Sequence, residues 1–300
     1  MGDETFKLPT HWREWIGSIH ADEIESCNLF LLSKMPSASA EVDDGENQKL
    51  TQNVQSFYGG LLLASTFAPS HKPALLTGYC LNGVVVVRSQ SEFAQPIPHH
   101  FLRYPPILPE DIDFAAKLAE QITAFHLGSV TGGHWRFSHT LSLYMETRTK
   151  PDILEQIHQY CRCIDGLIFS DAGKAKRQFK SRIEIFIGAG HHDLMGDTYE
   201  VRSAVEHLNE RQYLEPFVRE TRLDLLKKAV IVEFIARNAL ARILSDANLW
   251  PHFANNSSLE KFWKLDRADK EQLWGKTFDL KDALVGFDPQ FFSNGQLGAA

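Results

Sequence analysis

The feature that most constrains the fold is a series of apolar stripes at helical spacing in the second half of the chain. The first stripe consists of Ile153, Ile157, Cys161, Ile164 and Ile168. Further stripes of this kind cover residues 179–187, 194–205 and 223–244. Apolar side chains three or four residues apart lie on one face of a helix, and that face must pack against other elements. Because short loops join helices as antiparallel neighbours, the pattern predicts a four- to five-helix bundle.

The first part of the chain has a different, mixed pattern. Apolar runs at 75–81 and 84–87 flank Asn82-Gly83, a dipeptide typical of a tight β-hairpin turn. Helical spacing occurs before and after this hairpin. A proline-rich stretch between the hairpin and the second helical segment indicates an extended linker. We therefore expect a mainly α protein with a smaller N-terminal α+β domain at residues 1–128. A helical domain with a C-terminal extension is expected at residues 129–300.

Composition and charge exclude several classes of protein. The net charge of −7 argues against a general nucleic-acid coat but leaves room for a local basic groove. Four scattered cysteines are too few for a disulfide framework, and Cys161-x-Cys163 lacks the second ligand pair of a zinc site. No apolar run approaches the length of a membrane span, and the first residues lack the pattern of a signal peptide. We expect a cytoplasmic protein with no membrane partner, no metal and no cofactor.

One segment of the helical half combines an arginine and a histidine at a fixed spacing. Arg202 is followed directly by Ser203 and, after four intervening residues, by His207. Here the chain resembles the HEPN superfamily, in particular its ApeA-like branch, over about residues 135–250. Members of this superfamily carry Arg, four to six residues and then His, with a polar residue after the Arg.

The surrounding sequence matters because the bare spacing is weakly specific. Arg13 and His20, with six residues between them, satisfy it too, in a segment that lacks the bundle pattern. Around the second motif, residues 194–199 and the earlier helix at 161–168 fit the family. One departure is Leu208, because HEPN motifs often have Gly after the His.

The resemblance implies a chemistry. Catalytically active HEPN proteins are typically metal-independent ribonucleases that work as dimers, so RNA and a second copy of the chain are the expected partners. His207 would move a proton at the RNA 2′-hydroxyl or the leaving oxygen, because imidazole titrates near neutral pH. Arg202 would hold the phosphate, and Ser203 would orient His207 from the same helical face. Proteins of this branch often serve in phage defence or toxin systems, where an antitoxin or regulatory partner is also expected.

Helical geometry places the two main residues apart. With 3.6 residues per turn, Arg202 and His207 lie about 140° apart around an ideal helix. They converge only if the helix ends or distorts near His207, or if two subunits share one cleft. We therefore expect a homodimer that brings two motifs together.

A basic run precedes the motif. It contains Lys174, Lys176, Arg177, Lys180 and Arg182. Such a run attracts phosphates, which makes Lys176, Arg177 and Lys180 candidate substrate-binding residues. Most charge runs are only solvated faces, so a plain surface explains the same pattern.

Other interpretations stay open at this point. A surface salt bridge to Glu206 explains Arg202, and a cap at a helix C-terminus explains His207. The main alternative function is a non-catalytic HEPN module that binds a partner, a nucleotide or RNA. A third is a metal-dependent enzyme that uses the histidine pairs at 99–100 and 191–192.

Overall fold

The computed structural model describes residues 6–27, 29–36, 44–67, 74–81, 84–92, 95–129, 134–215 and 218–290. These residues are mainly helical, which confirms the predicted class. Contacts along the backbone divide the chain into two compact units. The first unit comprises Met1–Gln55 and Pro69–Ala94, and the second comprises Ser56–Ala68 and Gln95–Ala300.

The first unit combines short helices with a pair of strands. Its elements are α1 (Thr10–Ile16), α2 (Ser18–Glu25), the beginning of α3 (Asp44–Ala64), β1 (Ala74–Leu81) and β2 (Val84–Glu92). The strands pair antiparallel with Leu81 opposite Val84, and the register shifts after Thr77. The predicted Asn82-Gly83 turn lies outside the described residues.

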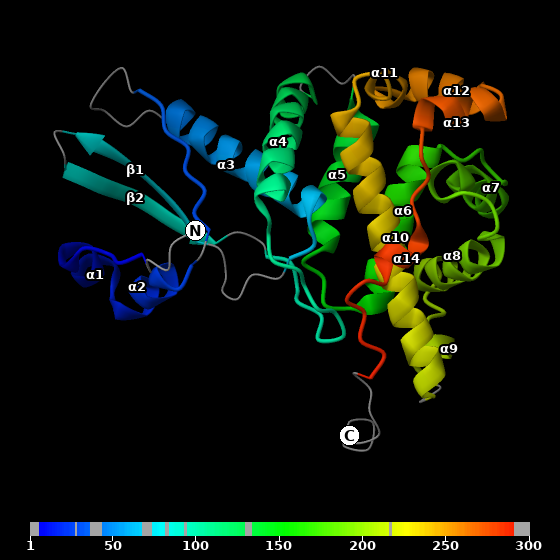
Figure 1. Ribbon diagram of the computed structural model, residues 1–300, viewed down its shortest axis with the longest axis horizontal. Coiled ribbons are helices and arrows are strands. Elements are labelled where there is room, and N and C mark those ends of the chain that lie inside the picture. Colours follow the sequence, from blue (N-terminus) through cyan, green and yellow to red (C-terminus); the bar gives the residue numbers. More distant parts are fainter. Residues whose placement is uncertain are drawn as a thin grey trace. The chain divides into compact units, whose positions relative to one another are not determined.

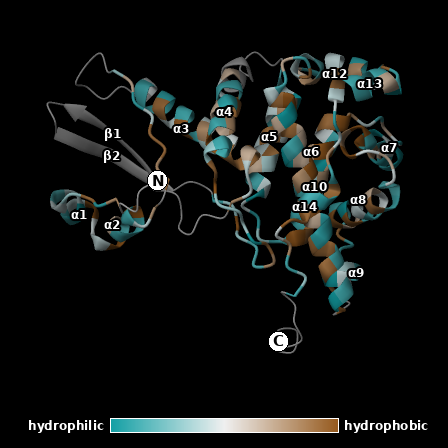
Figure 2. Cartoon of the chain, viewed as in Figure 1, coloured by the Kyte–Doolittle hydropathy of each residue, from teal (hydrophilic) through white to brown (hydrophobic). Residues whose placement is uncertain are grey.

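The second unit contains the end of α3 and the long helices of the chain. These helices are α4 (Pro109–Ser129), α5 (Trp135–Thr147), α6 (Ile153–Ile168), α7 (Ala175–Ile187), α8 (His192–Glu206) and α10 (Arg219–Ser245). Shorter helices are α9 (Arg211–Leu214), α11 (Trp250–Phe253), α12 (Asn256–Lys264), α13 (Arg267–Trp274) and α14 (Leu280–Ala283). Figure 2 shows hydrophobic residues along α6 and α10, which lie side by side.

Helix α6 lies at the centre of this unit, packed against α5, α8 and α10 (Figure 1). Asp152 caps its start by accepting a hydrogen bond from the Glu155 N–H at 2.7 Å. The predicted apolar stripe is buried along most of its length, from Ile157 to Ile168. The helix ends at Phe169, whose left-handed backbone (φ 52°) stops the helical pattern. The period of the apolar residues therefore identified the core helix correctly.

Helix α4 belongs to the second unit, so the predicted boundary at residue 128 falls inside that unit. The reason is packing: Ala115 and Leu118 are buried, and α4 contacts α5 and α10. The end of α3 also lies very close to α4, since a Cβ at Gly60 would lie 2.3 Å from the Ala115 carbonyl oxygen. The division between the units comes just before the proline-rich stretch that precedes α4, and not at the glycines that follow α4.

The residues after α10 fold back onto the bundle. The Trp263 indole donates a hydrogen bond to the Leu167 carbonyl at 2.9 Å, and the Phe278 N–H donates to the Phe186 carbonyl at 2.8 Å. Arg242 of α10 lies over the Phe278 ring, 4.2 Å from its centroid. The C-terminal extension is therefore part of the same hydrophobic core.

Candidate functional site at helix α8

Helix α8 carries the Arg–His motif on two neighbouring stripes, because residues three or four apart share a helical face. One stripe, which we call the α6 stripe, consists of Met195, Tyr199, Arg202 and Glu206. The other, the α7 stripe, lies one residue further along and consists of Gly196, Glu200, Ser203 and His207. The names follow from the packing of α8 against both helices: Arg202 and Glu206 contact α6, and Gly196 and Glu200 contact α7.

Arg202 is held at the contact between α8 and α6. Its Nη2 lies 3.7 Å from Asp165 Oδ2 on α6 and 3.4 Å from Glu206 Oε2 on its own helix. The guanidinium also lies over the Tyr199 ring, 5.1 Å from the centroid. The predicted salt bridge to Glu206 is present, and Asp165 adds a second carboxylate from another helix. The guanidinium therefore has a fixed position in a half-buried environment.

Asp165 is the carboxylate of this site that titrates nearest neutral pH. Burial raises the pKa of Asp165 to about 6, although the positive charge of Arg202 opposes that shift. Asp165 Oδ1 is buried and has no hydrogen-bond partner among the described residues. A carboxyl with this pKa is partly protonated near neutral pH, so its hold on Arg202 weakens as the pH falls.

A histidine completes the network on α6. His158 Nε2 lies 3.0 Å from Glu206 Oε2, and His158 Nδ1 lies 3.6 Å from Glu155 Oε2. The hydrogen bond from His158, with the charge of Arg202, lowers the pKa of the Glu206 carboxyl. Glu206 thus links Arg202 to His158, and the two helices are joined by a chain of polar side chains rather than by apolar packing alone.

His207 lies at the end of α8 and is exposed to solvent. It is the C-cap residue, and its N–H still donates to the Ser203 carbonyl at 3.1 Å, as in a regular helix. The turn comes one residue later, at Leu208, which has a left-handed φ of 57° and is 84% exposed. The angle of about 140° between Arg202 and His207 is therefore kept. Within one chain, the structure does not bring these two side chains together.

Two of the three predicted basic residues lie beside the α7 stripe. Lys176 forms an ion pair with Glu200, and the stem of Lys180 lies next to Gly196, where a Cβ would be 3.1 Å from Lys180 Cδ. Arg177 is exposed on α7. The basic run is thus close to the helical face that carries His207, and not to the face that carries Arg202.

Sequence reasoning missed Asp165 and His158. Both lie in α6, where their neighbours Ile157 and Ile164 are buried. A polar side chain inside an apolar helix needs a partner, since burying it unpaired is unfavourable. That signal was present in the sequence, but it did not indicate which residue on which other helix would be the partner.

Comparisons of the chain with protein-family models, with curated proteins and with solved structures find no match. No helix in the described part of the chain is both long enough and apolar enough to cross a bilayer. In that same part, His, Cys, Asp and Glu side chains do not gather in groups of three or more that could hold a metal ion. The role of α8 is therefore argued from its own geometry.

Proposed function

We propose that residues 135–250 are a HEPN domain and that the chain is a metal-independent endoribonuclease that acts as a homodimer. The observation that carries the proposal is the position of His207. It is an exposed imidazole at a helix end, on the same helical face as Ser203 and as Glu200, which pairs with Lys176 of α7. An exposed imidazole on a helical face that also contacts a basic helix suits proton transfer beside an RNA phosphate.

The reaction needs two groups at one phosphate. His207 takes the proton of the 2′-hydroxyl, whose oxygen attacks the adjacent phosphorus as the bond to the 5′-oxygen breaks. The leaving 5′-oxygen takes a proton from water, and His207 returns its proton to the solvent. The products are a 2′,3′-cyclic phosphate and a free 5′-hydroxyl, and no metal is required. Arg202 neutralises the charge that develops on the phosphate.

In our proposal these groups come from two chains, which the arrangement of α8 supports. Because Arg202 and His207 lie on different sides of α8, we place His207 of one chain beside Arg202 of the partner subunit. Asp165 and Glu206 orient Arg202, and protonation of Asp165 leaves more of the guanidinium charge for the phosphate. In a cell, such an activity would act as a toxin or phage-defence effector, held in check by an antitoxin or other regulatory partner.

The first test compares His207→Ala with His20→Ala, the histidine of the other Arg–His spacing. With a labelled single-stranded RNA in excess chelator, His207→Ala is expected to lose about 10²- to 10⁴-fold in cleavage rate, the range for a general acid or base. His20→Ala is expected to cleave like the unmodified chain. Equal cleavage by the unmodified chain and His207→Ala would contradict the proposal.

Mixing variants tests whether two chains share one site. Arg202→Ala and His207→Ala should each be inactive alone. After subunit exchange, half of the dimers are mixed and each mixed dimer has one intact site, so about a quarter of the full activity should return. Failure of the mixture to regain activity, with exchange shown by differently tagged chains, would rule out a shared site.

A non-catalytic RNA- or nucleotide-binding module is the second candidate. The observation that favours it is the engagement of Arg202 by two carboxylates, which competes with phosphate for the guanidinium. The same RNA distinguishes the two: retention by the unmodified chain without any cleavage product supports the binding module.

A further inference from the structure

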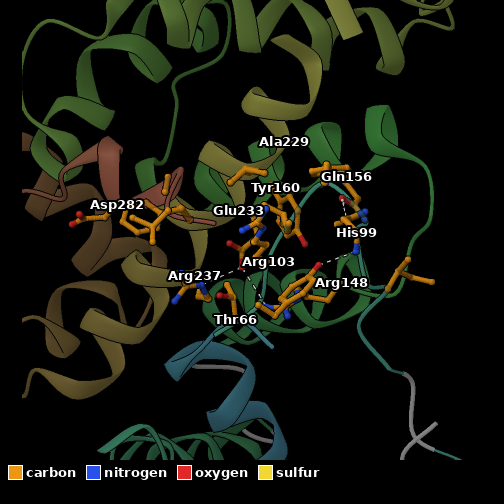
Figure 3. A pocket seen from close by; sticks show the side chains of 18 residues that line it. Thr66, His99, Arg103, Arg148, Gln156, Tyr160, Ala229, Glu233, Arg237 and Asp282 are labelled. Atoms are coloured by element: carbon orange, nitrogen blue, oxygen red, sulfur yellow. Dashed lines mark hydrogen bonds and ion pairs between the residues drawn. The ribbon is translucent and has the colours of Figure 1, made fainter. Parts of the chain in front are cut away.

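The second unit contains a cavity whose lining residues lie outside α8. It lies among the segment before α4, the end of α5, the start of α6, the middle of α10 and α14, and none of its lining residues belongs to α8. About 730 Å³ of empty space lies between these elements, part of it open to solvent. Figure 3 shows that charged and aromatic side chains from these elements surround one space.

A buried arginine forms one wall of this cavity. Arg148, at the end of α5, is 7% exposed. Its Nη1 donates to the Tyr144 hydroxyl at 3.0 Å and lies 3.3 Å from Glu233 Oε1 on α10. A buried guanidinium is stable only with partners, and these bonds supply them. Arg148 therefore has a clear structural role in joining α5 to α10.

The second arginine, Arg237, is not fully used by the fold. Its Nε donates to Glu233 Oε1 at 3.2 Å, the same oxygen that Arg148 and Tyr144 contact. Among the described residues, the two terminal nitrogens of Arg237 have no hydrogen-bond or ion-pair partner. This guanidinium lines the cavity, and only a small part of the side chain is exposed. Its outer edge is the fork that binds a carboxylate with two parallel hydrogen bonds.

The charges at this wall do not balance. On the buried side of the cavity, Arg148 and Arg237 share the carboxylate of Glu233, which leaves a surplus of one positive charge there. Arg103 and Asp282, which are exposed, line the outer side with opposite charges. Burial lowers the pKa of His99, so its imidazole adds no charge at neutral pH. A ligand with one negative charge would neutralise the wall, whereas a dianion would leave a buried negative charge without a partner.

The remaining wall is aromatic and can donate hydrogen bonds. His99 stacks on Phe101 with ring centroids 4.8 Å apart, and Tyr160 and Phe234 also line the space. The Tyr104 hydroxyl accepts a hydrogen bond from the His99 N–H at 2.9 Å, so its own proton is available to a ligand. Flat apolar surfaces beside a cationic fork suit a planar organic anion.

From this juxtaposition we infer that the cavity is a binding site for a small planar organic carboxylate, with Arg237 as the residue that binds the carboxylate group. Arg148 holds the carboxylate of Glu233, and that carboxylate in turn positions Arg237. The inference does not depend on ribonuclease activity, because none of these residues lies on α8.

The test uses the full chain and three probes in isothermal titration: benzoate, the neutral analogue benzamide, and the dianion phenyl phosphate. Benzoate should bind, benzamide should not, and phenyl phosphate should bind more weakly than benzoate. Arg237→Gln should weaken benzoate binding about tenfold or more, the loss expected for a charged hydrogen-bonded pair. Lys227→Gln, which removes a charge from the exposed face of the same helix, should bind benzoate like the unmodified chain.

Several outcomes would overturn the inference. They are no benzoate binding, equal binding of benzoate and benzamide, tighter binding of phenyl phosphate, or an equal benzoate affinity for Arg237→Gln and Lys227→Gln. If Arg237→Gln does not fold, as judged by thermal unfolding, Arg237→Lys replaces it. That variant keeps the charge but loses the fork, and it should still weaken benzoate binding several-fold.

Discussion

The chain contains two Arg–His pairs, with six and four residues between the members, and the structures around them differ. Between Arg13 and His20 the backbone turns at Gly17 (φ 85°), so the two residues lie on separate short helices. Arg13 pairs with Asp22, nine residues further along the chain, and His20 lies 3.2 Å from Glu23. His20, Asp22 and Glu23 are exposed to solvent. In the second unit the helix between Arg202 and His207 is continuous.

The surroundings of the two pairs differ even more. Trp15 and Ile19, beside the first pair, are 63% and 74% exposed, whereas Tyr199, beside the second, is buried. Arg202 finds its partner Asp165 on another helix of a packed core. The comparison shows that the spacing of an arginine and a histidine indicates a site only together with the packing around it, because packing fixes the direction in which a charged side chain points.

The largest effect is expected when each arginine is removed. Arg202→Ala leaves Asp165 half-buried without its cation, which should cost about 2 to 3 kcal/mol of unfolding free energy. Arg13→Ala removes the pair with the exposed Asp22 and a longer one with Glu25, which keeps its bond from Lys7, and should cost less than about 1 kcal/mol. Chemical denaturation of both variants measures the difference. If the two losses were equal, the contrast between the two regions would have no energetic basis.

The response to acid should have opposite signs in the two regions. Because the folded pKa of Asp165 is raised to about 6, its favourable contribution is complete below the unfolded value near 4 and is lost as the pH rises through 6. The pKa of Glu25 is lowered, chiefly by its hydrogen bond from Lys7. Its contribution is present above the unfolded value and is lost as the pH falls.

Hydrogen exchange at pH 5 and pH 7, corrected for the intrinsic rate, tests this prediction. From pH 7 to pH 5 the α6–α8 segment should be protected by about 1 to 2 kcal/mol from Asp165. A further measurement at pH 3 should show α2 loosened, because the contribution of Glu25 is lost only below its unfolded pKa. Asp165→Asn should abolish the first effect and leave the second. A change of the same sign in both segments would contradict the assignment.

The smallest effect concerns the turns beside each pair. Leu208 has a left-handed backbone that glycine adopts without strain, so Leu208→Gly should stabilise the chain by about 0.5 to 1 kcal/mol. Gly17 lies in a conformation that suits glycine alone, so Gly17→Ala should destabilise by about 1 kcal/mol. Thermal unfolding of both variants should show shifts in opposite directions. A melting point lowered by Leu208→Gly would mean that the Leu208 side chain has a packing role.

The sequence was sufficient for features that depend on local pattern. The spacing of Ile157, Ile164 and Ile168 predicted a buried helical face. It was insufficient for the domain boundary, because the position of α4 depends on its packing with α5 and α10.

The polar sites were harder still to predict. Asp165 and Arg202 are 37 positions apart, and the cavity draws residues from Thr66 to Val285. Nothing in the local sequence around Arg237 indicates that its partner oxygen is shared with Arg148. Such pairs depend on which helices pack together and in what orientation, and a single sequence does not show this directly.

Helix α6 has residues in both places where chemistry is proposed. His158 and Asp165 belong to the network with α8, and Gln156 and Tyr160 line the cavity. A helix packed on three sides moves as a stiff rod, so a slide or rotation of α6 would shift both sets of side chains at once. We therefore expect that a substitution that shifts α6 at one of the two places also moves side chains at the other.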